Sequence, residues 1–187
     1  MSRSLFALEL CVRLDAQAEL HRQLRATIPV DQSSVTLGQK WQNYHRATQL
    51  LLYNLRNAER GCWDYFDDDE RAENDFAMWK NGMTTAEGAR ENARPFSPAE
   101  PRYLTFTLAI QLVRDSPSDL ELRQVCAIPE GALWQRGVFA RLLQHFGRIS
   151  FASVHADVTY LIPRDIEFAL TSEDLAAQKF HYLRPLI

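Results

Sequence analysis

The sequence predicts an α+β fold, with an antiparallel or mixed sheet built from two repeated hairpin-like units plus one further strand, and with helices packed on one face. Three observations support this prediction. Apolar and polar residues alternate in three separate segments, a long helical pattern follows the first of them, and one stretch of the chain recurs later.

The recurring stretch occurs twice without a gap. Residues 5–29 align with residues 105–129, at a constant offset of one hundred positions. The identical pairs are Phe6/Phe106, Leu8/Leu108, Asp15/Asp115, Leu20/Leu120, Ile28/Ile128 and Pro29/Pro129. The repeat predicts a single domain, 1–187, with two halves, 1–94 and 102–187. A proline-rich linker with Pro95, Pro98 and Pro101 is expected to join them.

The first segment of each copy has the period of a β-strand. Apolar residues occupy every second position from Phe6 to Leu14, and again from Leu104 to Leu112, so each strand is expected to bury one face. A third alternating segment runs from Val154 to Ile162 and supplies the further strand.

Residues 16–28 fit two interpretations. Leu20, Leu24 and Ile28 have the i, i+4 spacing of a helix, but the same stretch also alternates as a strand. In the second copy, the residues from Asp115 to Asp119 are typical of a turn. These residues favour a hairpin in both copies, and a helix over 16–28 stays open.

Between the strands, the sequence predicts helices. The longest is expected to begin after Ser33 or Ser34 as its N-cap and to extend to about Asn57, before Gly61 breaks it. Further helices are predicted to end near Gly82, to span Thr84–Ala93, to run from Pro129 to Gly147, and to begin at Thr171 with Asp174.

The composition excludes several classes of function. The net charge is −3 and no run of basic residues occurs, so nucleic acid is not an expected partner. No segment has the roughly 20 apolar residues that span a bilayer. The seven glycines form no phosphate-binding motif, so no cofactor is expected. The three cysteines form no CxxC pair, and the expected location is a reducing cytoplasm.

A run of aromatic and acidic residues is the first candidate site. It contains the partner-binding candidates Trp63, Tyr65, Asp67, Asp68, Asp69 and Glu70. Clustered carboxylates can bind a cation, but the run lacks the ligand spacing and central glycine of a calcium-binding loop. Negative charge is also stabilised in the first turn of a helix. Helix capping is therefore the preferred interpretation, partner binding the second and a metal site the third.

A polar trio is the second candidate site. His155 and Asp157 are two positions apart in a strand and so point to the same side, where Glu9 of a neighbouring strand can meet them. Such a trio can perform acid–base chemistry or hold a metal. No known catalytic motif accompanies it, and a solvated or partner-covered polar face is the preferred interpretation.

Four features of the chain resemble one known family. They are the opening strand Leu5–Val12, the long helix with Thr48–Leu52 followed by Cys62-Trp63, the second strand Tyr103–Ile110, and the ending Leu170–Leu186. Together they resemble the domain of unknown function 1517 family of bacterial, cyanobacterial and chloroplast proteins. Family members in photosynthetic organisms are associated with membranes through a hydrophobic segment ahead of this domain. No such segment is expected here, so the resemblance implies peripheral membrane association at most, and it supplies no catalytic residues.

Two functional hypotheses follow. The first is a non-enzymatic protein-interaction or scaffold domain that forms a homo-oligomer or part of an assembly, because catalytic signatures are missing and strand edges can pair with another chain. The second is a small hydrolase or ligand-binding protein that uses the polar strand face around Glu9, His155 and Asp157. It requires these three side chains to converge in a pocket.

Overall fold

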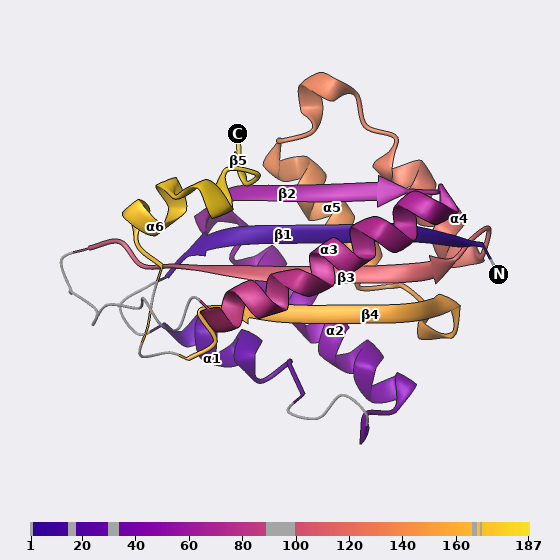
Figure 1. Cartoon of the computed structure of the whole chain (residues 1–187), viewed down its shortest axis with the longest axis horizontal. Coiled ribbons are helices and arrows are strands. Elements are labelled where there is room, and N and C mark those ends of the chain that lie inside the picture. Colours follow the sequence, from indigo (N-terminus) through magenta and orange to yellow (C-terminus); the bar gives the residue numbers. More distant parts are fainter. Residues whose placement is uncertain (1, 15–17, 30–33, 89–99, 166–167, 169) are drawn as a thin grey trace.

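An antiparallel sheet forms the middle layer of the molecule (Figure 1). The structure is a computed structural model that describes residues 2–14, 18–29, 34–88, 100–165, 168 and 170–187. In this described part of the chain the sheet has five strands in the order β4-β3-β1-β2-β5. The strands are β1 (Arg3–Arg13), β2 (Ala58–Phe66), β3 (Tyr103–Val113), β4 (Val154–Ile162) and β5 (Arg184–Pro185). The predicted α+β class with an antiparallel sheet is confirmed.

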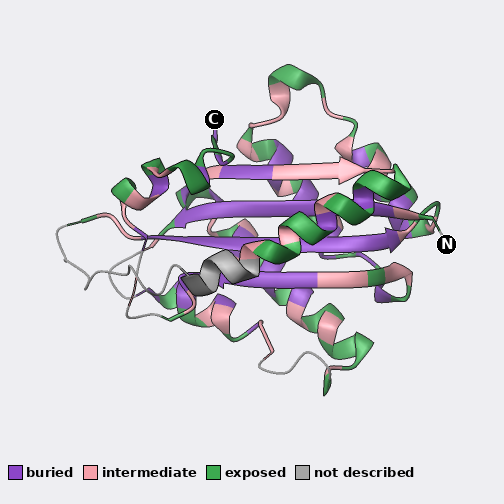
Figure 2. Ribbon diagram, viewed as in Figure 1, coloured by how far each residue is buried: buried purple, intermediate pink, exposed green. Residues whose placement is uncertain are grey.

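The strands β1 and β3 are the centre of the sheet. They pair antiparallel from Arg3 opposite Val113 to Arg13 opposite Tyr103, with Leu8 facing Leu108 in the middle. Both strands are buried along most of their length (Figure 2). Alternation in the sequence predicted one buried face, whereas in the structure both faces are covered.

The first face of the sheet carries the larger core. In the described part of the chain, four helices cover it: α1 (Glu19–Arg25), α2 (Leu37–Tyr53), α4 (Pro117–Cys126) and α5 (Arg136–Phe146). Their apolar sides pack against the strand residues Phe6, Leu8 and Leu10 and their neighbours on β3. The rings of Phe6 and Phe146, for example, lie 5.3 Å apart between their centroids.

The second face has a smaller core and a different cover. The helix α3 (Asp69–Gly88) crosses this face diagonally in front of the sheet, while α2 and α5 lie behind it (Figure 1). Ala72 and Phe76 of α3 pack on Leu5 and Ala7 of β1, and the C-terminal segment with α6 (Ser172–Ala176) adds Leu175. Helices therefore lie on both faces, and the prediction of one covered face was wrong.

The predicted hairpins are also wrong, because the second arm of each is helical. Glu19–Arg25 forms α1, which was the open alternative for 16–28, and Pro117–Cys126 forms α4. The hydroxyl of Ser116 accepts a hydrogen bond from the backbone N–H of Asp119, so Ser116 caps α4, and Pro117 takes the first helical position. The residues that resembled a turn are thus a helix start.

The strand β2 was missed. The helix α2 ends at Tyr53, a short 3-10 helix η2 (Leu55–Asn57) follows, and β2 begins at Ala58. Gly61 is inside this strand, where a Cβ atom would lie 2.8 Å from the ring of Phe139. The glycine therefore allows α5 to approach the sheet closely instead of breaking a helix.

Some helix ends differ from the prediction and others agree with it. Thr36 caps α2 through a capping box with Gln39, so the predicted cap Ser34 is wrong, and the alternative Ser33 lies outside the described residues. The helix α3 continues past Gly82 to Gly88, so the predicted break is wrong; residues 89–93 and Pro95 and Pro98 of the predicted linker are outside the described part. The predicted capping box of Thr171 and Asp174 at α6 is confirmed.

Candidate functional site

A row of polar side chains crosses the second face of the sheet. Glu9 on β1 pairs with Cys62 on β2 and with Thr107 on β3, which in turn pairs with Tyr160 on β4. Directly paired positions of neighbouring strands point to the same face of a sheet. All four residues are buried, and the row lies on the side of α3 and the C-terminal segment.

A pocket of about 660 Å³ opens above this row. One wall is the second half of α3, from Met78 to Gly82, and the opposite wall is the segment from Lys179 to Arg184. Most of the lining is apolar, and six aromatic residues of the described chain contribute to it: Trp63, Trp79, Trp134, Tyr160, Phe180 and Tyr182. The sheet supplies the floor, which includes Glu9 and Cys62.

Glu9 is the polar centre of the pocket floor. Its side chain is 0 % exposed to solvent, and the hydroxyl of Tyr182 donates to both carboxylate oxygens at 3.1 Å. Burial raises the pKa of the Glu9 carboxyl, and the hydroxyls of Thr105, Thr107 and Tyr182 oppose that rise. Thr105 and Thr107 nevertheless make no hydrogen bond of regular geometry, so Tyr182 is the well-placed partner of the carboxylate.

Tyr182 forms a cover over Glu9. Its residue is 45 % exposed, although its hydroxyl reaches the fully buried carboxylate. The chain around it is held in place, because Leu183 is buried, the Arg60 guanidinium donates to the Leu175 carbonyl, and the Leu186 N–H donates to the Glu59 carbonyl. The C-terminal wall of the pocket is therefore attached to β2 on both sides of Tyr182.

The opposite wall depends on a glycine in α3. A Cβ atom on Gly82 would overlap the hydroxyl of Tyr160 and lie 2.8 Å from its Cζ atom. Glycine at this position therefore allows the helix to lie directly on the Tyr160 ring at one end of the pocket. Gly82, which appeared to end a helix in the sequence, instead sets the distance between α3 and β4.

Three further charged side chains line the pocket. Asp64 on β2 has a raised pKa, caused first by burial and then by Asp75, while the indole of Trp79 lowers it. Lys179 and Arg184 are exposed on the C-terminal wall.

The structure does not bring His155, Asp157 and Glu9 together, so the predicted trio is wrong. Asp157 pairs with Ile110, which places it on the helix-covered first face. There it accepts a hydrogen bond from Lys40 Nζ at 2.5 Å and one from the Tyr44 hydroxyl at 3.2 Å. His155 is exposed near a register irregularity of β4. Of the three predicted residues, Glu9 alone lines the pocket.

The aromatic and acidic run is divided between a strand end and a helix start. Asp68 accepts a hydrogen bond from the Arg71 N–H at 2.9 Å and so caps α3, and Asp69 accepts one from the Arg3 N–H at 2.8 Å. Glu70 is exposed in the first turn of α3. Trp63 donates its indole N–H to the Leu133 carbonyl at 3.1 Å. No group of three or more His, Cys, Asp and Glu side chains in the described residues is arranged to hold a metal ion.

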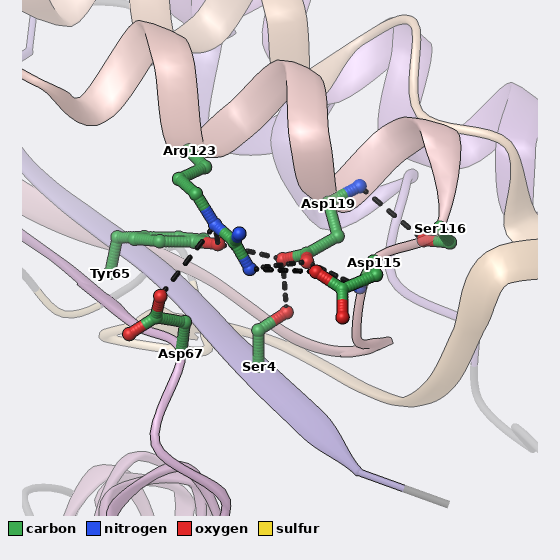
Figure 3. A network of polar contacts seen from close by, with 7 residues as sticks. All are labelled: Ser4, Tyr65, Asp67, Asp115, Ser116, Asp119 and Arg123. Carbon is green, nitrogen blue, oxygen red and sulfur yellow. Dashed lines mark hydrogen bonds and ion pairs between the residues drawn. The ribbon is translucent and has the colours of Figure 1, made fainter.

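Tyr65 and Asp67 belong to a polar network around Asp119 (Figure 3). Asp119 is fully buried at the start of α4 and accepts hydrogen bonds from the hydroxyls of Ser4 and Tyr65. The Arg123 guanidinium lies 3.3 Å from Asp119 and 3.6 Å from Asp67. This network connects β1, β2 and α4, so Tyr65 and Asp67 are engaged in holding the fold.

The pocket residues that the sequence did not single out come from distant parts of the chain. Tyr182, Tyr160 and Trp79 carry no local pattern that distinguishes them from core aromatics.

Comparison of the chain with protein-family models, with curated proteins and with solved structures gave no match. The resemblance to the domain of unknown function 1517 family stays a prediction. Among the described residues, no helix has both the length and the apolar character needed to cross a bilayer.

Proposed function

We propose that this chain is a non-enzymatic binding protein that holds a small organic molecule in the pocket over Glu9. One observation carries the proposal: a pocket of about 660 Å³ has an aromatic wall and a fully buried carboxyl group on its floor. Sites for small molecules are typically concave, mostly apolar cavities of roughly 300–1,000 Å³ with a few polar groups that orient the ligand.

Binding is favoured over catalysis by the chemistry of the lining. The Cys62 thiol on the pocket floor has a raised pKa, caused first by burial and then by Glu9. A thiol that keeps its proton is a poor nucleophile. Burial also raises the pKa of the Tyr182 hydroxyl. Within the described part of the pocket, no histidine is available as a general base.

Tryptophan fluorescence tests this proposal. Trp79 lines the pocket, whereas Trp41 is on α2, on the other side of the sheet. Small aromatic probes of positive, neutral and negative charge should produce a saturable change in emission that Trp41→Phe preserves and Trp79→Phe reduces. If no probe of any charge gives a saturable change up to its solubility limit, the chain has no functional pocket and the proposal is wrong.

A protein-interaction or scaffold role is the second candidate, and one observation favours it. In the described residues, β4 is an edge strand that pairs with β3 alone. An open edge can accept a strand from another chain, including a second copy of this one. Light scattering over a range of concentrations would reveal a homo-oligomer, and a strict monomer without partners in a pull-down would exclude this role.

The proposed location is the cytoplasm. The free thiols of Cys11, Cys62 and Cys126 support a reducing compartment. The peripheral membrane association that the family resemblance implies is a separate prediction, and liposome flotation would test it.

We also infer that the two halves are copies of one structural unit. The order strand, two helices, strand, helix occurs in both, as β1-α1-α2-β2-α3 and as β3-α4-α5-β4-α6. The repeat partners Leu8 and Leu108 face each other, and the pair Phe6–Ile110 has its counterpart in Leu10–Phe106. Two related units joined through equivalent strands would produce this register. The position equivalent to Glu9 in the second copy is Ala109, so the buried carboxylate belongs to one copy only.

A further inference from the structure

We infer that the ligand of the pocket is an organic cation, such as an amine or a quaternary ammonium ion, whose positive charge lies against Glu9 and whose apolar part contacts the aromatic wall. This inference rests on the proposed function and specifies the chemical class of its ligand. It is carried by the missing counter-charge of Glu9 and by the aromatic surroundings of that carboxyl group.

The carboxyl group of Glu9 has no cationic partner in the described part of the chain. Its well-placed hydrogen bonds come from the Tyr182 hydroxyl, and none of the described Lys, Arg and His side chains forms an ion pair with it. Buried carboxylates are normally paired with a cation, because removal of an isolated charge from water is unfavourable. Glu9 nonetheless lines the pocket floor beneath the Tyr182 hydroxyl, so a ligand that displaces this hydroxyl can supply the missing charge.

The other charged groups of the pocket do not take this role. Lys179 and Arg184 are exposed on the C-terminal wall, where solvent screens their charge. Asp64 is a second carboxylate whose pKa burial and Asp75 raise, but the nearby positive charge of Arg71 already opposes that rise. Glu9 is therefore the acidic group with the greatest need of a ligand cation.

The aromatic wall suits the same class of ligand. Trp79, Tyr160, Phe180 and Tyr182 line the pocket that opens above Glu9. The negative face of an aromatic ring attracts a cation, and rings around an ammonium group replace part of its hydration when the group leaves water. A carboxylate with aromatic rings around it thus offers both the counter-charge and the apolar contacts of an organic cation.

A neutral ligand that accepts a hydrogen bond from protonated Glu9 is the main alternative, and pH separates the two. A cation favours ionised Glu9, so its affinity rises as Glu9 of the free protein loses its proton, whereas the affinity of a neutral acceptor falls. The other titratable groups that face Glu9 are the thiols of Cys11 and Cys62, the phenols of Tyr160 and Tyr182, and the Asp64 carboxyl, with Lys179 and Arg184 on the wall. Burial raises the pKa of each thiol and phenol, so they stay protonated around neutral pH, and Asp64→Asn removes the remaining acid.

The experiment compares three probes of similar size: phenyltrimethylammonium, 2-phenylethanol and phenylacetate. Phenyltrimethylammonium carries a permanent charge, so any pH dependence belongs to the protein. Binding is followed by tryptophan fluorescence and calorimetry in the Trp41→Phe background. We expect the cation to bind at least tenfold more tightly than either other probe, with an affinity that rises with pH. Its binding should also release protons, which calorimetry in two buffers of different ionisation enthalpy would detect.

Glu9→Gln should lower the affinity for the cation at least tenfold and leave the affinity for the neutral probe unchanged. Asp64→Asn should preserve the preference for the cation. Equal or tighter binding of the neutral or anionic probe, or a Glu9→Gln variant that binds the cation normally, would overturn the inference and leave the pocket as a binding site. If none of the probes binds, the proposed function itself fails. Should Glu9→Gln not fold, the probe comparison and the pH profile of the Trp41→Phe protein decide the question alone.

Discussion

The carboxyl group of Glu9 is expected to destabilise the free protein when it is ionised. Burial raises its pKa in the folded state, so folded Glu9 binds its proton more tightly than unfolded Glu9 does. The free energy of unfolding should therefore fall as pH rises from the unfolded pKa through the folded pKa, and the penalty should persist above it. We predict that Glu9→Gln is more stable than the natural chain at about pH 8.

Urea denaturation of both proteins at several pH values would measure this difference, which should disappear towards acid pH, where Glu9 is protonated in both states. Glu121→Gln is the matched control, because Glu121 is an exposed residue of α4 and should show no such pH-dependent difference. A Glu9→Gln variant that is less stable than the natural chain at alkaline pH would show that the ionised carboxylate is well compensated in the fold.

Asp119 is a buried carboxylate with the opposite surroundings. It accepts hydrogen bonds from the Tyr65 hydroxyl and the Asp115 N–H, both at 2.8 Å, and it faces the Arg123 guanidinium (Figure 3). We predict that Asp119→Ala destabilises the protein by about 3 kcal/mol or more, because it leaves the buried Ser4 hydroxyl and several partly buried donors without an acceptor. Chemical denaturation would measure the loss. Glu121→Ala on the same helix should change stability by less than about 0.5 kcal/mol, and an equal effect of both substitutions would contradict a structural role of the network.

At the scale of the elements, the contact of α3 with β4 depends on Gly82. In an exposed helix, alanine is more favourable than glycine by about 1 kcal/mol. On α3, however, the new methyl group would overlap the Tyr160 hydroxyl. We predict that Gly82→Ala destabilises the protein by about 1–3 kcal/mol through overpacking.

The double variant Gly82→Ala/Tyr160→Phe tests the mechanism, since it removes the overlapping hydroxyl and should recover part of the loss. Gly137→Ala on α5 is the control, because nothing lies within 4 Å of the position its Cβ would take, so this change should be neutral or stabilising. Thermal denaturation of the three variants would show the pattern, and a stabilised Gly82→Ala protein would mean that α3 moves without cost.

The elements that could be predicted from the sequence are those with a strong local period or a cap. Alternation identified β1, β3 and β4, and the pair Thr171 and Asp174 identified the start of α6. The helices α1 and α4 are short, and a short stretch with few apolar residues fits a helix and a strand equally well. The strand β2 was hidden because Gly61 and the polar residues around it lack a clear period, and the packing of Phe139 that explains the glycine is tertiary.

The candidate site could be predicted only in part, for a related reason. Glu9 was predicted as a candidate because it could meet His155 and Asp157 from a neighbouring strand, but the residues that lie beside it depend on the register between strands. A shift of one residue moves a side chain to the other face of the sheet. The register puts Tyr160 beside Thr107 in the row of Glu9 and sends Asp157 to the first face. Tyr182 lies 173 positions from Glu9, and only the folded chain brings the two together.

At the scale of the whole molecule, the two halves depend on one another. The strands β1 and β3 belong to different halves, pair along their full length, and are buried on both faces. Either half alone would expose the edge of its central strand and the apolar residues that pack against the other half. The pocket has the same dependence, because Glu9 and Trp79 come from the first half and Tyr160 and Tyr182 from the second.

We therefore predict that the fragments 1–94 and 102–187 do not fold when they are produced separately, and that the intact chain unfolds in one cooperative transition. Circular dichroism with a thermal scan would show no cooperative transition for either fragment, whereas a mixture of the two should regain part of the native signal by forming the β1–β3 ladder. A fragment that folds alone would show that the halves are independent domains, and the shared sheet would then be a contact between them. Because the pocket needs both halves, cation binding should return with the mixture and be missing from each fragment, which connects the cooperativity of the fold to the proposed function.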